Sequence, residues 1–305
     1  MHSPILTVVL ATYNGARFLP EQLFSLSAQS RRPDRLVLRD DGSRVVSVDI
    51  VRAWTDREGI DLQLVEGDRL GPARSFLVAV QAAHSADLFL FCDQDDVWFP
   101  DKIERALALV PHGDDAAPVL YATRLDIADE HLHSLRLSSI PKNLSFESAA
   151  FESVLTGCRM AFNAAFRTRL IQGVPSHIGM HDWWCYLLAT ATNGAALHFD
   201  PKPSVNYRQH SSNTLGAGPT GWRALYERVR RFMRGDSTLR SRQLHEFEGL
   251  HVKVLSPHAA TILHQLLGAK SALLPRLTVA FTVPIHRQTW RANLTTRLAL
   301  LTNRF

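Results

Sequence analysis

An apolar segment that ends in a cluster of carboxylates most constrains how this chain folds. Residues 88–92 are all apolar, which is typical of a buried parallel strand, and three aspartates follow within four positions. Open α/β sheets bind ligands just beyond the carboxyl ends of their strands. Alternate side chains of an extended segment share a face, so we expect Asp93 and Asp95 to point one way. Two such oxygen donors suit Mg²⁺ or Mn²⁺; the alternative is a solvated turn with a helix cap.

The first part of the chain alternates predicted strands and helices. Apolar runs predict strands over 5–12, 35–39, 62–65 and 88–91, with amphipathic helices between them. This alternation predicts an α/β fold with a mixed, mostly parallel, Rossmann-like sheet. No GxGxxG motif follows the first strand and no GxxxxGK[ST] motif occurs, so dinucleotide-binding and P-loop folds are unsupported.

The second part is less regular, and its predicted elements are shorter. We expect strands over 119–123, 153–162 (interrupted by Gly157), 196–199 and 205–208, a polar loop or lid over 130–148, and a helix over 184–192.

Composition shifts predict three parts. Residues 1–216 form the main α/β domain, 217–221 (AGPTG) form a linker, and 222–305 form a basic, mainly helical C-terminal extension. Its amphipathic stretches are expected at 222–234, 256–272 and 288–304.

Charge is unevenly distributed along the chain. The formal net charge is +5, and seven arginines lie between Trp222 and Gln243. A basic block favours phosphate-bearing partners, and here it predicts peripheral contact with an anionic membrane. The alternative is a solvated basic helix packed on the domain. Because no aromatic stacking platform accompanies the arginines, no nucleic acid partner is expected.

The location is expected to be cytoplasmic, with the membrane contact on the inner face of a bacterial membrane. All three cysteines lie in apolar segments, which favours reduced thiols. No signal peptide is recognised at the start, and no run of eighteen apolar residues predicts a membrane span.

Seven short motifs follow one another in a recognisable order. They are ATYNG (11–15), DDGS (40–43), LGPA (70–73), DQDDVW (93–98), TGC (156–158), HDWW (181–184) and YRQHSSN (207–213). Together they resemble the family 2 glycosyltransferases, which have the GT-A fold, and more narrowly the rhamnosyltransferase-like branch of bacterial polysaccharide enzymes.

The resemblance implies a nucleotide site along the carboxyl ends of the strands. Asp41 is placed to accept the imide N–H of uracil or thymine, although an ordinary turn with a helix cap would also explain the DDGS motif. The implied nucleotide-binding residues are Thr12, Tyr13, Asn14, Arg17, Asp40, Asp41, Gly42, Asp93 and Gln94.

The remaining implied roles concern metal, base and acceptor. A divalent cation, Mn²⁺ or Mg²⁺, is expected on Asp93, Asp95 and His210, while Asp96 supports the loop by hydrogen bonds. Asp182 is the expected base, because a carboxylate can take the proton that an attacking hydroxyl releases. The residues implied on the acceptor and sugar side are Gly157, His181, Trp183 and Arg208.

One base and one displacement imply an inverting transferase. The expected donor is a dTDP- or UDP-sugar, such as dTDP-L-rhamnose, and the expected acceptor is a glycan or a lipid-linked glycan. A nucleotidyltransferase of the same fold would need a Gly-rich basic loop that ATYNGAR does not provide. A catalytically silent nucleotide-sugar or glycan-binding protein is the remaining alternative. Two residues depart from the family pattern: Ser75, where asparagine is expected, and Arg159, where a small residue is usual.

Overall fold

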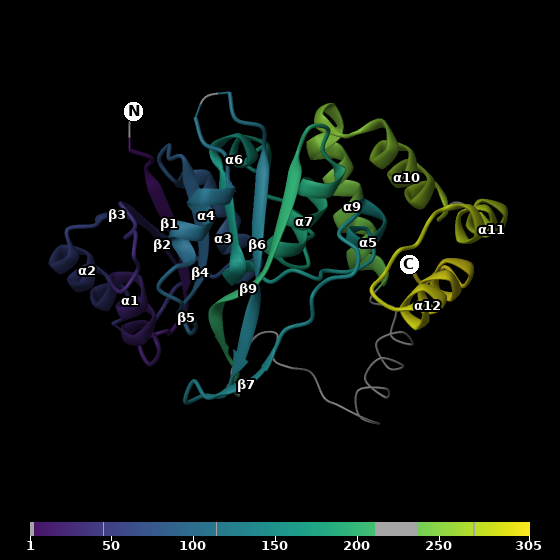
Figure 1. Cartoon of the computed structure of the whole chain (residues 1–305). Helices are drawn as coiled ribbons and strands as arrows, with labels where there is room; N and C mark the ends of the chain where they lie inside the picture. Colours follow the sequence, from purple (N-terminus) through teal and green to yellow (C-terminus); the bar gives the residue numbers. More distant parts are fainter. Residues whose placement is uncertain (1–2, 45, 114, 211–236, 271) are drawn as a thin grey trace.

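The computed structural model of the chain describes residues 3–44, 46–113, 115–210, 237–270 and 272–305 (Figure 1). Within these residues, nine strands form one mixed sheet in the order β3-β2-β1-β4-β8-β6-β9-β5, and β7 pairs with β6. The strands are β1 (Leu6–Thr12), β2 (Arg35–Asp40), β3 (Asp61–Glu66), β4 (Leu88–Asp93), β5 (Val97–Trp98), β6 (Val119–Ala128), β7 (Ser134–Leu137), β8 (Met160–Asn163) and β9 (Ala196–Arg208). The prediction of a mixed α/β sheet is confirmed.

Helices cover both faces of this sheet. Val9 of β1 packs in one apolar cluster with α3 and α7, while its neighbours Val8 and Leu10 pack in a second cluster with α1, α2 and α4. The helices are α1 (Leu19–Ser27), α2 (Ser47–Glu58), α3 (Pro72–Ala82), α4 (Lys102–Leu109), α5 (Phe146–Ala149), α6 (Ala164–Leu170), α7 (His181–Ala191), α9 (Ser237–His251), α10 (Pro257–Gly268), α11 (Leu273–Thr282) and α12 (Trp290–Leu301), with short 3₁₀ turns η1 (Gly157–Arg159) and η2 (Val252–Val254).

The register of the parallel strands brings their carboxyl ends to one edge. In β1, Thr12 lies opposite Asp40 of β2, and Ala11 lies opposite Asp93 of β4. The three strands are buried along most of their length on both faces, with apolar residues at their centres. Their polar terminal residues therefore gather where the sheet ends.

Three local predictions in the second half were wrong. The interruption predicted at Gly157 is present as the 3₁₀ turn η1 (Gly157–Arg159), but the predicted strand over 153–162 is too long, because β8 begins only at Met160. The two strands predicted over 196–208 are one strand, β9, with a bulge at its two prolines. The region 130–148 is not all loop, since it contains β7 and the start of α5.

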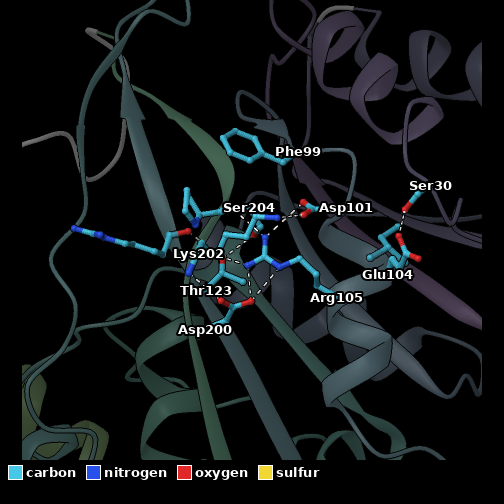
Figure 2. Close-up of polar contacts among 12 residues, drawn as sticks. Ser30, Phe99, Asp101, Glu104, Arg105, Thr123, Asp200, Lys202 and Ser204 are labelled. Atoms are coloured by element: carbon cyan, nitrogen blue, oxygen red, sulfur yellow. Dashed lines mark hydrogen bonds and ion pairs between the residues drawn. The ribbon is translucent and has the colours of Figure 1, made fainter.

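A polar network holds the bulge of β9 to α4 (Figure 2). Arg105 of α4 donates from Nε to Asp200 Oδ2 at 3.0 Å and from Nη1 to the Pro203 carbonyl at 3.0 Å. The hydroxyls of Thr123 and Ser204, both buried, lie 2.7 Å apart. Proline has no N–H to donate to the β-ladder, and the pairing of β6 with β9 is irregular here. Side-chain hydrogen bonds, such as that from Arg105 to the Pro203 carbonyl, take the place of some backbone hydrogen bonds.

The helices after residue 236 share their core with the sheet domain. Trp184 of α7 packs edge-on against Phe247 of α9, with ring centroids 5.2 Å apart, and Ser256 N–H donates to the Ala191 carbonyl at 2.8 Å. α10 and α12 match the predicted amphipathic stretches, whereas the linker 217–221 and the stretch 222–234 lie outside the described residues. None of the helices described is both long and apolar enough to cross a membrane.

Candidate active site

A cavity of about 510 Å³ opens at the carboxyl edge of the sheet. It is lined by the loops after β1 and β4, the start of α3 and the first turn of α7. Twelve of the predicted site residues line it: Thr12, Tyr13, Asn14, Arg17, Asp41, Asp93, Gln94, Asp95, Gly157, His181, Asp182 and His210. Asp40, Gly42, Trp183 and Arg208 are not among its lining residues.

Gln94 holds the loop after β1. Its Oε1 accepts hydrogen bonds from Thr12 Oγ1 at 2.8 Å and from Tyr13 N–H at 2.9 Å. A Cβ at Gly15 would lie 2.3 Å from the same oxygen, so the loop closes tightly only with glycine there. The bonds of Gln94 within the protein thus shape the cavity wall.

The two adjacent aspartates after β2 do different things. Asp41 accepts bonds from the N–H groups of Leu70 and Gly71, at 2.7 and 2.8 Å, and from Ser75 Oγ at 2.7 Å. Ser75, which departs from the family pattern, is therefore a partner of Asp41. Asp40 turns back and accepts from Ser43 N–H at 2.8 Å, which is the turn that the sequence left as an alternative.

Arg69 was missed by the sequence reasoning. Its guanidinium carbon lies 4.1 Å from the centre of the Tyr13 ring, and both residues line the cavity. A cation over an aromatic face makes a flat, positively charged wall suited to a planar anionic ligand. Its position directly before the LGPA motif was the only signal in the sequence.

Burial and mutual repulsion shift pKa values in the acidic cluster after β4. Burial, followed by repulsion from Asp95 and Asp182, raises the pKa of Asp93 to about 8. Asp95 Oδ2 lies 2.8 Å from His210 Nε2, so residues 115 positions apart meet at this point. The carboxyl groups therefore lie close together, and a bound cation would reduce the repulsion between them.

Two sets of donor atoms are available to a metal near Asp93. Among the described residues, Asp93, Asp96 and Cys158 place ligand atoms within 4.8 Å of one another. Asp96 and Cys158 are buried away from the cavity, and burial raises the pKa of the Cys158 thiol, which keeps it protonated. Oxygen and imidazole donors suit Mg²⁺ and Mn²⁺ better than a thiol does. Asp93, Asp95 and His210 line the cavity, but residues 94 and 95 form a turn, and these three residues are not a group whose ligand atoms lie within 4.8 Å of one another. A cation held by Asp93, Asp95 and His210 therefore stays a prediction.

Asp182 lies in the first turn of α7 with one oxygen unpartnered. Its Oδ2 accepts from Gly157 N–H at 3.1 Å, while Oδ1 is buried with no hydrogen-bond partner among the described residues. Burial raises the pKa of Asp182 to about 6, against the lowering effect of the Trp183 and Gly157 N–H groups and of Arg159. Asp182 lines the cavity, and a carboxylate in this state is suited to accept a proton.

His181 is packed by aromatic rings beside the base. Its ring centroid lies 4.0 Å from that of Phe76 and 4.8 Å from that of Phe91, and burial lowers its pKa to about 3, so the ring is neutral. A Cβ at Gly157 would lie 2.1 Å from His181 Nε2. Glycine at 157 therefore makes room for the imidazole that lines the cavity.

The other acceptor-side candidates make structural contacts. Trp183 donates from Nε1 to the Ala149 carbonyl at 2.7 Å. Arg208 donates to the Asp95 carbonyl at 2.8 Å and to the Glu130 carbonyl at 2.6 Å, next to the loop after β4. Arg159 is buried and donates to the Thr123 carbonyl at 3.2 Å, outside the cavity wall. Contact of Trp183 and Arg208 with a sugar stays a prediction.

Solved structures share this fold. The first 349 residues of TarS from S. aureus superpose with a TM-score of 0.58 at 14% identity, covering 98% of this chain and 82% of that one. The mannosyltransferase PcManGT of Pyrobaculum calidifontis, solved with GDP-Man and Mn²⁺, gives a TM-score of 0.53 at 19% identity, covering 99% and 75%. At such identities the likeness shows the fold, which is GT-A.

Sequence relatives are glycosyltransferases. The dTDP-rhamnosyl transferase RfbG of Shigella flexneri is 27% identical over 231 residues, which cover 72% of this chain and 78% of that protein. Validoxylamine A glucosyltransferase of Streptomyces hygroscopicus subsp. limoneus is 33% identical over 111 residues, covering 35% and 24%. The family model described as Glycosyl transferase family 2 matches residues 7–174, more than half of the chain. The chain therefore belongs to glycosyl transferase family 2.

Proposed function

We propose that this glycosyltransferase is a metal-dependent, inverting enzyme that moves a sugar onto a hydroxyl of a bacterial surface polysaccharide or a lipid-linked glycan. The donor is L-rhamnose on dTDP, or another hexose on dTDP or UDP. The observation that carries the proposal is the unpartnered Oδ1 of Asp182, buried beside a cavity that Asp93, Asp95 and His210 also line. The similarity to RfbG supports the choice of rhamnose.

The protein's part in the reaction divides between two sets of residues that line the cavity. Asp93, Asp95 and His210 would hold Mn²⁺ or Mg²⁺, which would supply charge stabilisation to a leaving diphosphate. Asp182 accepts the proton of the acceptor hydroxyl as it attacks the anomeric carbon. Because a single displacement takes place opposite the leaving group, the anomeric configuration inverts. The product's configuration can be read from its NMR coupling constants, and retention would contradict this scheme.

The nucleotide is held, in this proposal, by the loop after β1 and the wall formed by Tyr13 and Arg69. Thr12, Asn14, Arg17, Asp41, Gly42 and Gln94 keep the roles that the family resemblance implies, and Asp40 shapes the turn beside them. The peripheral membrane contact expected for residues 222–242 remains a prediction, since 211–236 lie outside the described residues.

Calorimetric titration with dTDP and with UDP, each with Mn²⁺ and with EDTA, tests the donor site. We expect one nucleotide to bind with Mn²⁺, and chelation or Asp95→Ala to weaken it by at least about tenfold. Asp56→Ala, which removes an exposed carboxyl on α2, is the matched control and should bind as the wild type does. If neither nucleotide binds under any condition, the donor site is wrong.

A further inference from the structure

Two helices at one end of the molecule turn large apolar side chains outward. α11 and α12 pack together at the end of the fold opposite α2 (Figure 1), and Arg297 donates to the Ala280 carbonyl between them. The exposed apolar residues are Leu273 (59%), Leu274 (73%), Leu277 (38%) and Phe281 (73%) on α11, and Trp290 (70%), Leu294 (50%) and Leu298 (47%) on α12. We call these seven side chains the apolar hairpin face.

Their spacing makes an outer stripe on each helix. On α12 the exposed residues recur every four positions, and on α11 they fall within one side of the helix. A different stripe faces inward: Val279 and Ala280 on α11, and Ala299 and Leu300 on α12, are buried. Each helix therefore has an apolar stripe for the core and a second one that nothing within the described residues covers.

The charge of this region has one sign. After Glu248 the sequence contains no aspartate or glutamate up to Phe305, but it contains seven lysines and arginines. Arg287 forms an ion pair with Glu152 at 2.8 Å. Arg276 and Arg291, which flank the two outer stripes, have no carboxylate partner among the described residues. The apolar hairpin face is thus bordered by cations that have no counter-charge nearby.

We propose that the apolar hairpin face docks on an anionic lipid bilayer. Stable attachment to a membrane surface takes two signals, an apolar face and positive charge, and both occur here. A second copy of the chain is a poorer occupant, because a symmetric contact would bring the same cations together without an acid between them. The docking surface shares no residue with the basic stretch 222–242 or with the lining of the donor cavity. Its failure would leave the transferase proposal intact.

Vesicle co-sedimentation of the full chain tests the docking. Vesicles with about one third phosphatidylglycerol should bind the wild type, and phosphatidylcholine alone should bind it at least about tenfold more weakly. Phe281→Ser together with Trp290→Ser should weaken binding to the anionic vesicles by at least about tenfold. Phe24→Ser is the matched control, since Phe24 is 71% exposed on α1, and it should bind as the wild type does.

Charge reversal separates the two signals. Arg276→Glu with Arg291→Glu should weaken binding about tenfold at low salt, and the difference should shrink at about 0.5 M salt. Thermal unfolding must show that each variant folds as the wild type does. Three results would overturn the proposal: no binding of the wild type to anionic vesicles, undiminished binding of the Phe281 and Trp290 variant, or a wild-type dimer in analytical ultracentrifugation that this variant dissociates.

Discussion

At the scale of single residues, two aspartates that look alike in the sequence have opposite surroundings. Asp41 accepts three hydrogen bonds from the start of α3 and its preceding loop. Asp182 is just as buried but keeps one oxygen without a partner. An unpartnered buried oxygen is costly and persists where a ligand completes it. Asp96 also keeps a buried oxygen without a partner among the described residues, but it does not line the cavity, so Asp182 is the carboxyl that we propose as the acceptor of a substrate proton.

If Asp182 is the base, its pKa sets how kcat falls at acid pH. A base acts as the carboxylate, and since burial raises its pKa to about 6, the proton stays bound below that pH. We expect kcat to fall about tenfold per unit below about pH 6, two units higher than an ordinary aspartate would give. The measurement is kcat against pH at saturating Mn²⁺.

Asp182→Asn is the companion variant for that profile. The amide cannot accept the proton, so kcat should fall by about 10²–10⁴ while nucleotide affinity is kept. The limb near pH 6 should disappear from whatever rate remains. A limb that survives in this variant would assign the titration to another group.

The sequence predicted which residues line the cavity better than it predicted which groups each of them contacts. Twelve predicted site residues line the cavity because motif order and strand ends place them there. Arg69 was missed because its contact with Tyr13 joins segments 56 positions apart, and no local pattern records it. Arg208 was predicted on the sugar side; its backbone partners, Asp95 and Glu130, are distant from it in the sequence and could not be predicted, while its contact with a sugar stays a prediction.

At the scale of elements, the end of β9 supports the loop that follows β4. Arg208 is 3% exposed, and its backbone N–H donates a hydrogen bond to Asp96 Oδ1 at 3.1 Å. Its side chain bonds the Asp95 carbonyl and also pairs with Glu21 of α1. One arginine thus ties β9, α1 and the loop after β4 together, next to the histidine that meets Asp95.

Replacing that arginine should loosen the loop. Arg208→Met leaves buried acceptors unpaired, so we expect a loss of about 2–4 kcal/mol in unfolding free energy and weaker nucleotide binding in the presence of Mn²⁺. Arg57→Met is the control: Arg57 lies on α2, is 67% exposed and does not line the cavity, so this variant should change stability by less than about 1 kcal/mol and leave nucleotide binding unchanged. Urea unfolding and calorimetry measure the two effects, and equal losses in both variants would contradict the supporting role.

At the scale of the whole molecule, the C-terminal helices complete the core. Leu244 and Phe247 of α9 belong to the same buried cluster as Trp184, Cys185 and Leu188 of α7. α7 also carries the catalytic candidate in its first turn. The predicted boundary between 1–216 and 222–305 is therefore not a boundary in apolar packing, although the division itself remains a prediction.

A mutation in the extension should consequently destabilise the entire fold. Phe247 is fully buried, so Phe247→Ala should cost about 3–5 kcal/mol in one cooperative transition. Phe281→Ala, at a residue 73% exposed, should stay within about 0.5 kcal/mol. Denaturant unfolding followed by fluorescence and circular dichroism measures both variants. Two separate transitions would show that the extension unfolds by itself.

The sequence by itself determined the alternation of strands and helices, the family and the edge at which polar residues gather. These depend on periodicity and short motifs, which act over a few residues. Tertiary structure decided which carboxyl keeps an unpartnered oxygen, which arginine braces a loop, and which apolar stripes lie buried or exposed. Those outcomes depend on partners that are distant in the chain. The chemistry of a buried polar atom depends on which groups form hydrogen bonds with it, and the role of an apolar side chain depends on whether another part of the structure covers it.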